Sequence, residues 1–547
     1  MKKGKQLTGK IVFVVGLLLA AAIYYYITIP AINIHSAGMW AFMIGLVLMI
    51  GCAVAVRKLK KSGHMRFTKN GLDIDPGHIG YAKYIFWFCG LLVVIFVVGS
   101  VLSSPIINAK KYRQLLTVEE RNFTEDVKEV DFNTIPLLDR DSASILVNRK
   151  MGSMVDMVSQ FEVADDYTQI NYNDRPVRVT PLRYASGIKW LTNQKNGIPA
   201  YIRIDMATQN AECIKLSEGI KYSHSEFFNR YIYRHLRFKY PTYIFADQIF
   251  FEIDEEGTPF WICPVKKFNI GLFGGQTIGR VVICNAITGE CVDYAVEDTP
   301  QWVDKVYQAE LLMDLYDYHG TLVRGYFNSI LGQKDCLQTT NGYNYIAMDD
   351  DVWVYSGVTS VSGDQSNVGF VLMNQRTMET RFYEIEGAIE DSAMSSAEGQ
   401  VQNLGYQATF PLLLNISGEP TYFMALKDAA GLVKKYAMVN IQQYQWVAIG
   451  DTVKECRKQY NKLLATNGIT GTENADSLEA SGKIATYRTV VIDGTSHVYF
   501  TVEGYDEIFD VDLSTEDTLS IIKYKEGDVI SIGYVEGDVL SQVTGIK

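Results

Sequence analysis

The chain has 547 residues, 48% of them hydrophobic, and its 51 basic and 62 acidic residues give a formal net charge of −11 at pH 7. A chain of this length forms more than one domain, because single hydrophobic cores rarely grow past a few hundred residues. The acidic surplus is repelled by phosphate backbones, which disfavours nucleic-acid binding.

Three uncharged apolar stretches lie near the N-terminus, each close to the roughly 20 residues that a helix needs to cross a bilayer. They are Ile11–Ile29, Met39–Val56 and Tyr84–Leu102. The first is long, lacks a small-residue cleavage site and is followed almost at once by the second, which is not typical of a signal peptide. Residues 1–104 are therefore predicted to form a membrane anchor of three transmembrane helices.

Basic residues fall on one side of this predicted anchor. Four lysines precede the first stretch, seven basic residues lie between the second and the third, and the connection near His35 has none. Positive charge marks the cytoplasmic side. We therefore expect a multi-pass protein of the cell membrane with a cytoplasmic N-terminus and with every residue after 104 extracytoplasmic. Residues 1–104 carry a net charge of +9, so the remainder carries −20.

Residues 105–165 begin with a charged segment that is predicted to form a helical stalk and connector. Thr117 and Glu120 have the spacing of a capping box, in which each side chain bonds the backbone at a helix start. An ordinary solvated helix is the expected form of this segment.

A ten-residue pattern occurs twice, as GTPFWICPVK (Gly257–Lys266) and GEPTYFMALK (Gly418–Lys427). Around both copies the predicted order is a hairpin, a second hairpin and a helix, which after the first copy spans residues 299–315. Two fainter copies complete a tandem repeat. The predicted modules, each an antiparallel sheet with a helix, span 166–240, 241–325, 343–405 and 406–465.

The aligned modules share particular residues. Pro176 and Pro420 correspond to Pro259, and Trp353 is placed in the position of Trp261 and Tyr422. At the second hairpin an Asn or Asp is followed three residues later by Thr, or once by Gln, which predicts a turn held by the first side chain. These first residues are Asp205, Asn285, Asn374 and Asn440. A shared ligand-binding role for them is the alternative.

The modules resemble PepSY-type domains through Asn285, Thr288 and Gly289, and through Asp205 and Thr208 in the first copy. The resemblance covers roughly residues 166–465 and implies small extracytoplasmic α+β modules. Such relatives are linked to inhibiting peptidases or modulating cell-wall enzymes. As a whole, the chain resembles membrane-anchored envelope proteins of Gram-positive anaerobes.

The last part of the chain is predicted to be a separate domain. Residues 466–480 are polar and rich in small residues, which indicates a linker. Residues 481–547 alternate in hydrophobicity around a turn at Asp493 and Gly494, which predicts a small β-barrel of the OB or SH3 kind. Because this region is acidic, we expect it to pack or dock against protein. The fold class is therefore α+β with an N-terminal membrane anchor.

The eight cysteines show no CxxC and no regular framework. A turn at Thr288 and Gly289 would place Cys291 opposite Asn285 or Ala286, so a disulfide with Cys284 is not expected. The chain also lacks a P-loop, a G-x-S-x-G and an HExxH, so we predict no catalytic residue and no cofactor.

Two clusters are candidate binding sites. On a helix, Arg230, Arg234 and Arg237 form one basic edge with His235 nearby, which favours an acidic partner. The alternative is pairing with acids of a neighbouring module. Asp349, Asp350 and Asp351 supply oxygen ligands for a metal ion such as calcium, although a solvated hairpin tip has the same composition. The segment 271–277, GLFGGQT, is expected to be a flexible loop.

These features favour a non-enzymatic envelope protein whose modules stack outward as a rod or arc and bind a protein partner. The alternative is an envelope enzyme or transport-associated component that acts on a wall polymer or peptide. Paired carboxylates in a cleft, one with a raised pKa, would mark that alternative.

Overall fold

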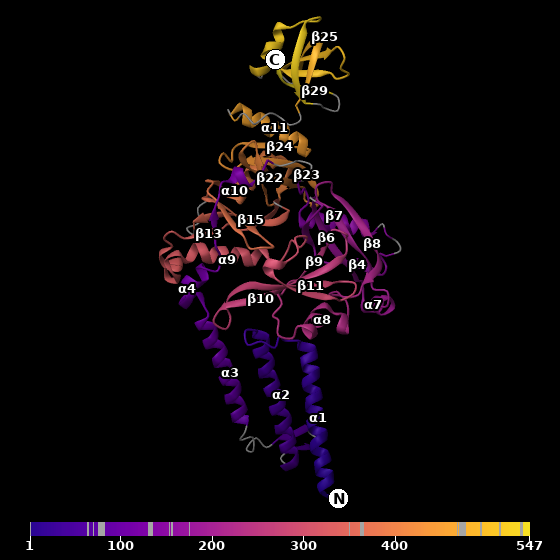
Figure 1. The fold of residues 1–547 in the computed structure, drawn as a ribbon, viewed down its shortest axis with the longest axis vertical. Coiled ribbons are helices and arrows are strands. Elements are labelled where there is room, and N and C mark those ends of the chain that lie inside the picture. Colours follow the sequence, from indigo (N-terminus) through magenta and orange to yellow (C-terminus); the bar gives the residue numbers. More distant parts are fainter. Residues whose placement is uncertain are drawn as a thin grey trace. The chain divides into compact units, whose positions relative to one another are not determined.

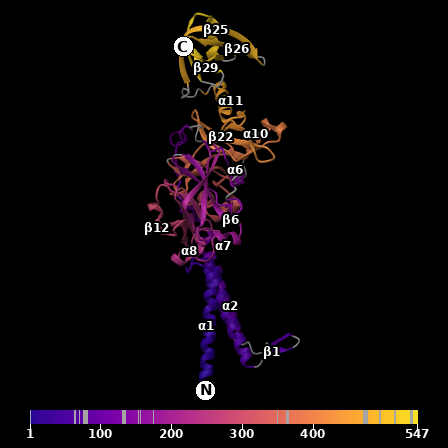
Figure 2. The same ribbon diagram turned by 90° about the vertical axis from the view of Figure 1, so that its right-hand side faces the viewer.

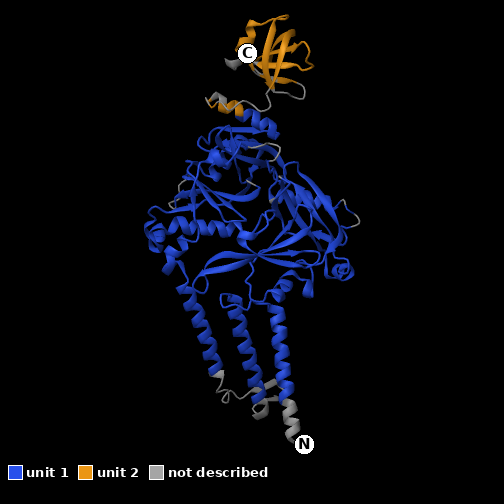
Figure 3. Ribbon diagram, viewed as in Figure 1, with its two compact units in different colours: residues 1–460 blue, residues 461–547 orange. Residues whose placement is uncertain are grey.

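The computed structural model describes residues 2–62, 65–68, 71–74, 82–129, 135–152, 154, 157–173, 175–348, 350–360, 366–467, 469, 477–492, 495–513, 516–535 and 540–546. Contacts divide the chain into two compact units, residues 1–460 and 461–547 (Figure 3). The two units are described separately.

Unit 1 begins with three long helices, α1 (Lys2–Thr28), α2 (Ala37–Ser62) and α3 (Ala82–Leu102) (Figure 1). Among the described residues, these are the helices long and apolar enough to cross a membrane. The segments that could span a membrane are Lys10–Thr28, Ala37–Lys58 and Tyr84–Leu102, which confirms the predicted number and placement of the apolar helices. A short hairpin of β1 (Met65–Thr68) and β2 (Gly71–Ile74) connects α2 to α3 (Figure 2).

The connector that follows is only partly helical. Its elements are α4 (Pro105–Arg113), β3 (Glu119–Glu120), α5 (Phe123–Asp126) and α6 (Arg140–Gly152). The expected helix start at Thr117 is wrong. Glu119 and Glu120 instead extend alongside strand β18 (Thr380–Tyr383), and this backbone pairing outweighs the local capping pattern.

Four sheets in the described part of unit 1 share one strand order, in which four consecutive strands form an antiparallel meander. The first sheet has β5 (Thr168–Tyr172), β6 (Arg175–Tyr184), β7 (Ile198–Asp205) and β8 (Asn210–Ile220), and β4 (Phe161–Val163) also pairs with β6. The second has β9 (Phe250–Ile253), β10 (Pro259–Ile270), β11 (Gly274–Asn285) and β12 (Cys291–Ala295).

The third and fourth sheets repeat this order, with two extra short strands in the third, one of them β3 on β18, and one extra short strand in the fourth. The third has β14 (Asn344–Met348), β15 (Asp351–Ser360), β17 (Gly369–Asn374) and β18 (Thr380–Tyr383), with β13 (Leu337–Thr339) on β15. The fourth has β21 (Leu412–Ile416), β22 (Glu419–Lys427), β23 (Val433–Asn440) and β24 (Val447–Gly450), with β20 (Gln407–Ala408) on β22. A two-stranded pair joins β16 (Ser366–Asn367) to β19 (Gly387–Ala388).

The predicted side-chain turns are present in all four sheets. The Oδ1 atoms of Asp205, Asn285, Asn374 and Asn440 each accept a hydrogen bond from the backbone N–H three residues ahead, and the first three also from the N–H two residues ahead. Short polar side chains compete with the β-ladder in this way and so end the strand. The structural interpretation of the Asn/Asp pattern is confirmed.

The prolines occupy equivalent positions, as predicted. The residue that follows each turn-forming Asn or Asp donates its backbone N–H to the carbonyl of Pro176, Pro259, Val352 or Pro420 in the respective sheet, at 3.0–3.1 Å. Val352 therefore takes the place of proline in the third sheet. Trp353 lies opposite Asn374, whereas Trp261 and Tyr422 lie one position further, so its predicted alignment was shifted by one residue.

The carbonyl of the residue after each turn-forming Asn or Asp also accepts hydrogen bonds from the connector that precedes the sheet. The carbonyl of Met206 accepts from Leu137 N, and that of Ile441 accepts from Ala388 N, both at 2.9 Å. In the second and third sheets each carbonyl accepts from two successive amides, those of Lys221 and Tyr222 on Ala286 and those of Val306 and Tyr307 on Gln375. Each sheet is thus linked through its turn to the chain that arrives from the previous element.

The hydrophobic cores lie between successive sheets rather than within separate modules. One core joins the first and second sheets through residues such as Val179 and Trp261, and a second joins the second and third through Val281 and Val371. A third core joins the third and fourth sheets and contains Tyr422. Strands such as β10 are buried on both faces, which is why their sequences do not alternate.

The helices α7 (Gly187–Asn193), α8 (Ile232–Lys239), α9 (Ala309–Thr321), α10 (Glu390–Gln400) and α11 (Val453–Thr466) lie in the connections. The predicted helix 299–315 starts ten residues late. Residues 299–308 instead run extended or as turns to the third sheet, where Val306 and Tyr307 donate to the carbonyl of Gln375.

The glycine-rich segment 271–277 is the tip of the β10–β11 hairpin and contacts the anchor, so the expected flexible loop is not observed. Leu272 N and Phe273 N donate to Ser103 Oγ, just after α3, at 2.8 and 3.2 Å. Gly271 has φ +60°, and a Cβ there would lie 2.3 Å from that oxygen. Glycine is therefore required for both the turn and the close approach.

The second hairpin of the second sheet also corrects the cysteine prediction. The six residues 285–290 form the turn, so Cys284 and Cys291 are directly paired across β11 and β12. The predicted partners Asn285 and Ala286 are instead part of the turn itself. Both cysteines carry free thiols.

Unit 2 contains β25 (Ser477–Ile492), β26 (Thr495–Val502), β27 (Phe509–Asp512), β28 (Val529–Val535) and β29 (Ser541–Ile546). The strands pair in the order β25-β26-β27-β29-β28, and β28 pairs back with β25 to close the ring. β25 begins inside the predicted linker, and the predicted turn at Asp493 and Gly494 lies outside the described residues. The OB-like or SH3-like identity stays a prediction.

Replacing Asn285 with alanine should destabilise unit 1 by about 1–3 kcal/mol, because two backbone amides lose their acceptor. Asn285→Asp keeps the acceptor oxygen, as Asp205 does in the first sheet, and should retain most of the stability. Urea unfolding of the full chain in detergent, followed by tryptophan fluorescence, measures both. Equal stability of the two variants would contradict the role given to this side chain.

Candidate functional site

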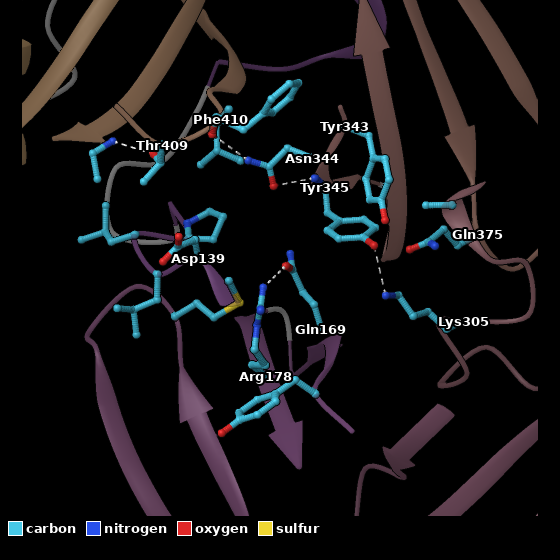
Figure 4. A pocket seen from close by; sticks show the side chains of 18 of the residues that line it. Asp139, Gln169, Arg178, Lys305, Tyr343, Asn344, Tyr345, Gln375, Thr409 and Phe410 are labelled. Carbon is cyan, nitrogen blue, oxygen red and sulfur yellow. Dashed lines mark hydrogen bonds between the residues drawn. The ribbon is translucent and has the colours of Figure 1, made fainter. Parts of the chain in front are cut away.

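A cavity of about 350 Å³ lies where all four sheets approach one another (Figure 4). Its lining comes from segments far apart in sequence, including residues 136–139 of the connector. The polar residues that line it include Asp139, Gln169, Arg178, Lys305, Glu310, Tyr343, Asn344, Tyr345, Gln375 and Thr409. Met206, Phe250, Phe410 and Met424 are among the apolar ones. The site is therefore a product of the assembled repeat.

Arg178 gives one wall of the cavity a positive charge. It lies on β6 opposite Gln169 of β5, and its Nη2 donates to Gln169 Oε1 at 3.2 Å. Its neighbours Val177 and Val179 point to the core between the first two sheets, so strand alternation turns Arg178 to the opposite face. The guanidinium is buried, with 7% of the residue exposed.

Lys305 supplies a second buried cation from the connector after the second sheet. Its Nζ lies 3.4 Å from the Tyr345 hydroxyl, 4.4 Å from the centre of that ring and 5.6 Å from the centre of the Phe250 ring. Ring faces attract a cation without neutralising it. A desolvated ammonium group in this setting is suited to binding an anion.

The carboxylates on the cavity wall already have partners. Asp139 forms an ion pair with Lys427 and accepts from Ser142 N; although burial acts to raise the pKa of Asp139, these contacts hold it below its usual value. Glu310 accepts a hydrogen bond from the Tyr343 hydroxyl at 2.7 Å. These acids therefore compete weakly for the two buried cations.

Gln375 lines the cavity and carries a buried acceptor without a partner in the described part of the chain. It is fully buried, and its Nε2 donates to Tyr307 O at 3.1 Å. Its Oε1 has no hydrogen-bond partner among the described residues. A buried acceptor left without a donor is costly, so a bound N–H group would stabilise this position.

Two acids with raised pKa values lie behind the cavity wall. Glu252 accepts from Asp304 N and Lys305 N at 3.0 and 2.9 Å, and Asp304 accepts from Asn171 N at 2.7 Å. Burial raises the pKa of Glu252 to about 8, and burial with the nearby Glu252 charge raises that of Asp304. Their exposures are 0% and 1%, and neither residue lines the cavity.

The predicted basic edge lies at the end of α1. Arg234 Nε donates to Tyr26 O at 3.3 Å and Arg237 Nε to Ile29 O at 3.0 Å, where a helix end leaves carbonyls without partners. Arg230 donates to Gln194 O. His235 points to Gly289 O instead, at 2.7 Å. These partners belong to the same chain and are carbonyls rather than acids; an additional outside partner stays a prediction.

The predicted acidic cluster is only partly described. Asp349 lies outside the described residues. Asp350 accepts from Asn171 Nδ2 at 3.0 Å, and Asp351 forms an ion pair with Arg376 at 2.7 Å. The Asp351 carboxylate is thereby satisfied by protein groups. A metal ion at this hairpin stays a prediction.

Sequence reasoning did not identify the cavity. Arg178 was visible as a charge in the apolar middle of a strand, and Gln375 follows the turn-forming Asn374. Neither position indicates which segments will face it, because the walls come from all four sheets. The usable signal was the charged residue that interrupts an otherwise buried strand.

No protein-family model matches the chain, and no curated protein matches its sequence. The resemblance to PepSY-type domains therefore stays a prediction. The geometry of the cavity carries the functional interpretation.

The buried acids give unit 1 a pH-dependent stability. A carboxyl whose pKa rises on folding binds its proton more tightly in the folded state, so stability falls as the pH rises from about 4.5 to about 8. Asp304→Asn keeps an oxygen for Asn171 N and should flatten this dependence. Urea unfolding across that pH range measures it, with Glu256→Gln as the exposed control. An unchanged slope in Asp304→Asn would contradict the assignment.

Proposed function

We propose that this chain is a membrane-anchored, extracytoplasmic binding protein of the cell envelope, and that its cavity holds an acidic peptide segment of a protein partner. One observation carries the proposal. The residues that line this single cavity include two buried cations, Arg178 and Lys305, and Gln375, whose Oε1 acceptor is unpaired among the residues that the structure describes. A peptide presents both a carboxylate and backbone N–H donors.

The amide-rich lining supports a peptide over a simple inorganic anion. Gln169, Gln248, Gln308, Asn344 and Gln375 all contribute to it. Side-chain amides both donate and accept, which matches the alternating groups of a peptide backbone. A spherical anion would leave the acceptors of such a site without donors.

A binding role is favoured over catalysis by the placement of the acids. Glu252 and Asp304 have the raised pKa values expected of catalytic groups, but they are sealed from the cavity. The alternative function, an envelope enzyme or transport-associated component, has no comparable observation in its favour. PepSY-like modules that act on a partner protein remain part of the proposal.

Short peptides that carry Asp or Glu should bind the full chain in detergent, and the same peptides with Asn or Gln should bind more weakly. Lys305→Met keeps the side-chain length and removes the charge, so it should weaken binding by roughly tenfold or more. Isothermal titration calorimetry measures the affinity, with Lys267→Met, which is exposed and outside the cavity, as the matched control. Equal affinity of Lys305→Met and the unsubstituted chain would refute the proposed site.

The extracytoplasmic location makes a separate prediction. In a chain with Cys213→Ser, a membrane-impermeant maleimide should label Lys195→Cys in intact cells but label Lys5→Cys only after permeabilisation. Lys195 is exposed and follows the predicted anchor, Lys5 precedes its first span, and native Cys336 is buried and a poor probe. The reverse labelling pattern would invert the topology and remove the envelope assignment.

A further inference from the structure

Three side chains with metal-ligating atoms converge beside α8, away from the cavity. They are His235 of α8, Cys284 at the end of β11 and Cys291 at the start of β12. One ring nitrogen and the two sulfur atoms all lie within 4.8 Å of one another. The sequence separates His235 from the cysteines by about fifty residues, so no local spacing reveals the group.

The fold holds these groups together independently of any ion. Cys284 and Cys291 are direct partners across the β11–β12 pair, next to the turn formed by Asn285. The α8 helix packs its buried residues Ile232 and Leu236 into the core shared by the first two sheets, which sets the direction of His235. The three ligands are thus borne by a rigid strand pair and a packed helix.

The neighbouring groups suit a cation site. Gly289 O lies 2.7 Å from His235 Nε2, and the ring of Tyr222 lies 4.5 Å from the imidazole centre. A carbonyl of this kind orients a ligating histidine in many metal sites. Two thiolates carry the negative charge that neutralises one divalent ion. Cys284 and Cys291 are buried, and the partly exposed His235 leaves a path for entry.

Cysteine binds a metal ion as the thiolate, so uptake of a divalent ion would release the Cys284 and Cys291 protons to solvent.

We propose that His235, Cys284 and Cys291 form a binding site for Zn²⁺ or a similar thiophilic divalent ion, with a fourth position open to water or another ligand. Donor atoms on one tetrahedral zinc lie roughly 3.3–3.8 Å apart, so small side-chain rotations close the observed spacing. Sites with three protein ligands of this kind keep an exchangeable fourth position. The ion would tie α8 to the second sheet, and this inference does not depend on the cavity.

The test uses the full chain in detergent, reduced and stripped of metal with a chelator, and titrated with Co²⁺ and then Zn²⁺. One equivalent of Co²⁺ should produce a thiolate-to-cobalt charge-transfer absorption that Zn²⁺ abolishes. Zn²⁺ should also raise the unfolding temperature. Cys291→Ser and His235→Gln should lose both effects, whereas Cys213→Ser, a cysteine of the first sheet, should keep them.

Near-ultraviolet circular dichroism of each variant verifies that it is folded. The proposal is overturned if the reduced chain gives no charge-transfer band, or if Cys291→Ser keeps the band at full strength. It is also overturned if mass spectrometry finds a Cys284–Cys291 disulfide and the reduced chain takes up no cobalt. In that case the pair is a structural disulfide rather than a metal site.

Discussion

The backbone carbonyl that follows each turn-forming Asn or Asp is the contact on which unit 1 depends. The side chain of Asn285, for example, holds its own turn, and the next carbonyl accepts the amides of the incoming connector. Because backbone groups must be paired when buried, this carbonyl serves as a docking point that needs no particular side chain from its partner. The same contact recurs at residues 206, 375 and 441 and so sets the order in which the sheets join.

This linkage explains why the repeat forms one body instead of separate modules. Once a connector is fixed at the edge of the next sheet, the apolar faces of the two sheets are brought together and share a core. The helices are then left to fill the connections. An isolated sheet of this kind would expose a large apolar face, so a single repeat is not expected to fold alone.

The sequence revealed what is encoded locally. The three apolar helices, the strand order and the side-chain turns follow from composition and from three-residue spacings, so they were predictable. The burial of β10 on both of its faces could not be predicted, because a strand buried on both faces lacks alternation between apolar and polar residues. The late start of α9 depends on contacts between distant segments. The same is true of the cavity that Arg178 and Lys305 both line. Cys291 was misplaced because a six-residue turn was treated as a tighter one.

The β10–β11 hairpin has a mechanical consequence, because its tip is fixed at Ser103 where the third apolar helix ends. His35, between the first two helices, bonds the same tip through Leu272 O at 2.7 Å. If these helices tilt to suit a thinner or thicker bilayer, the long hairpin moves with them as a lever. Lipid composition would then alter the packing of the core shared by the first two sheets without any soluble signal.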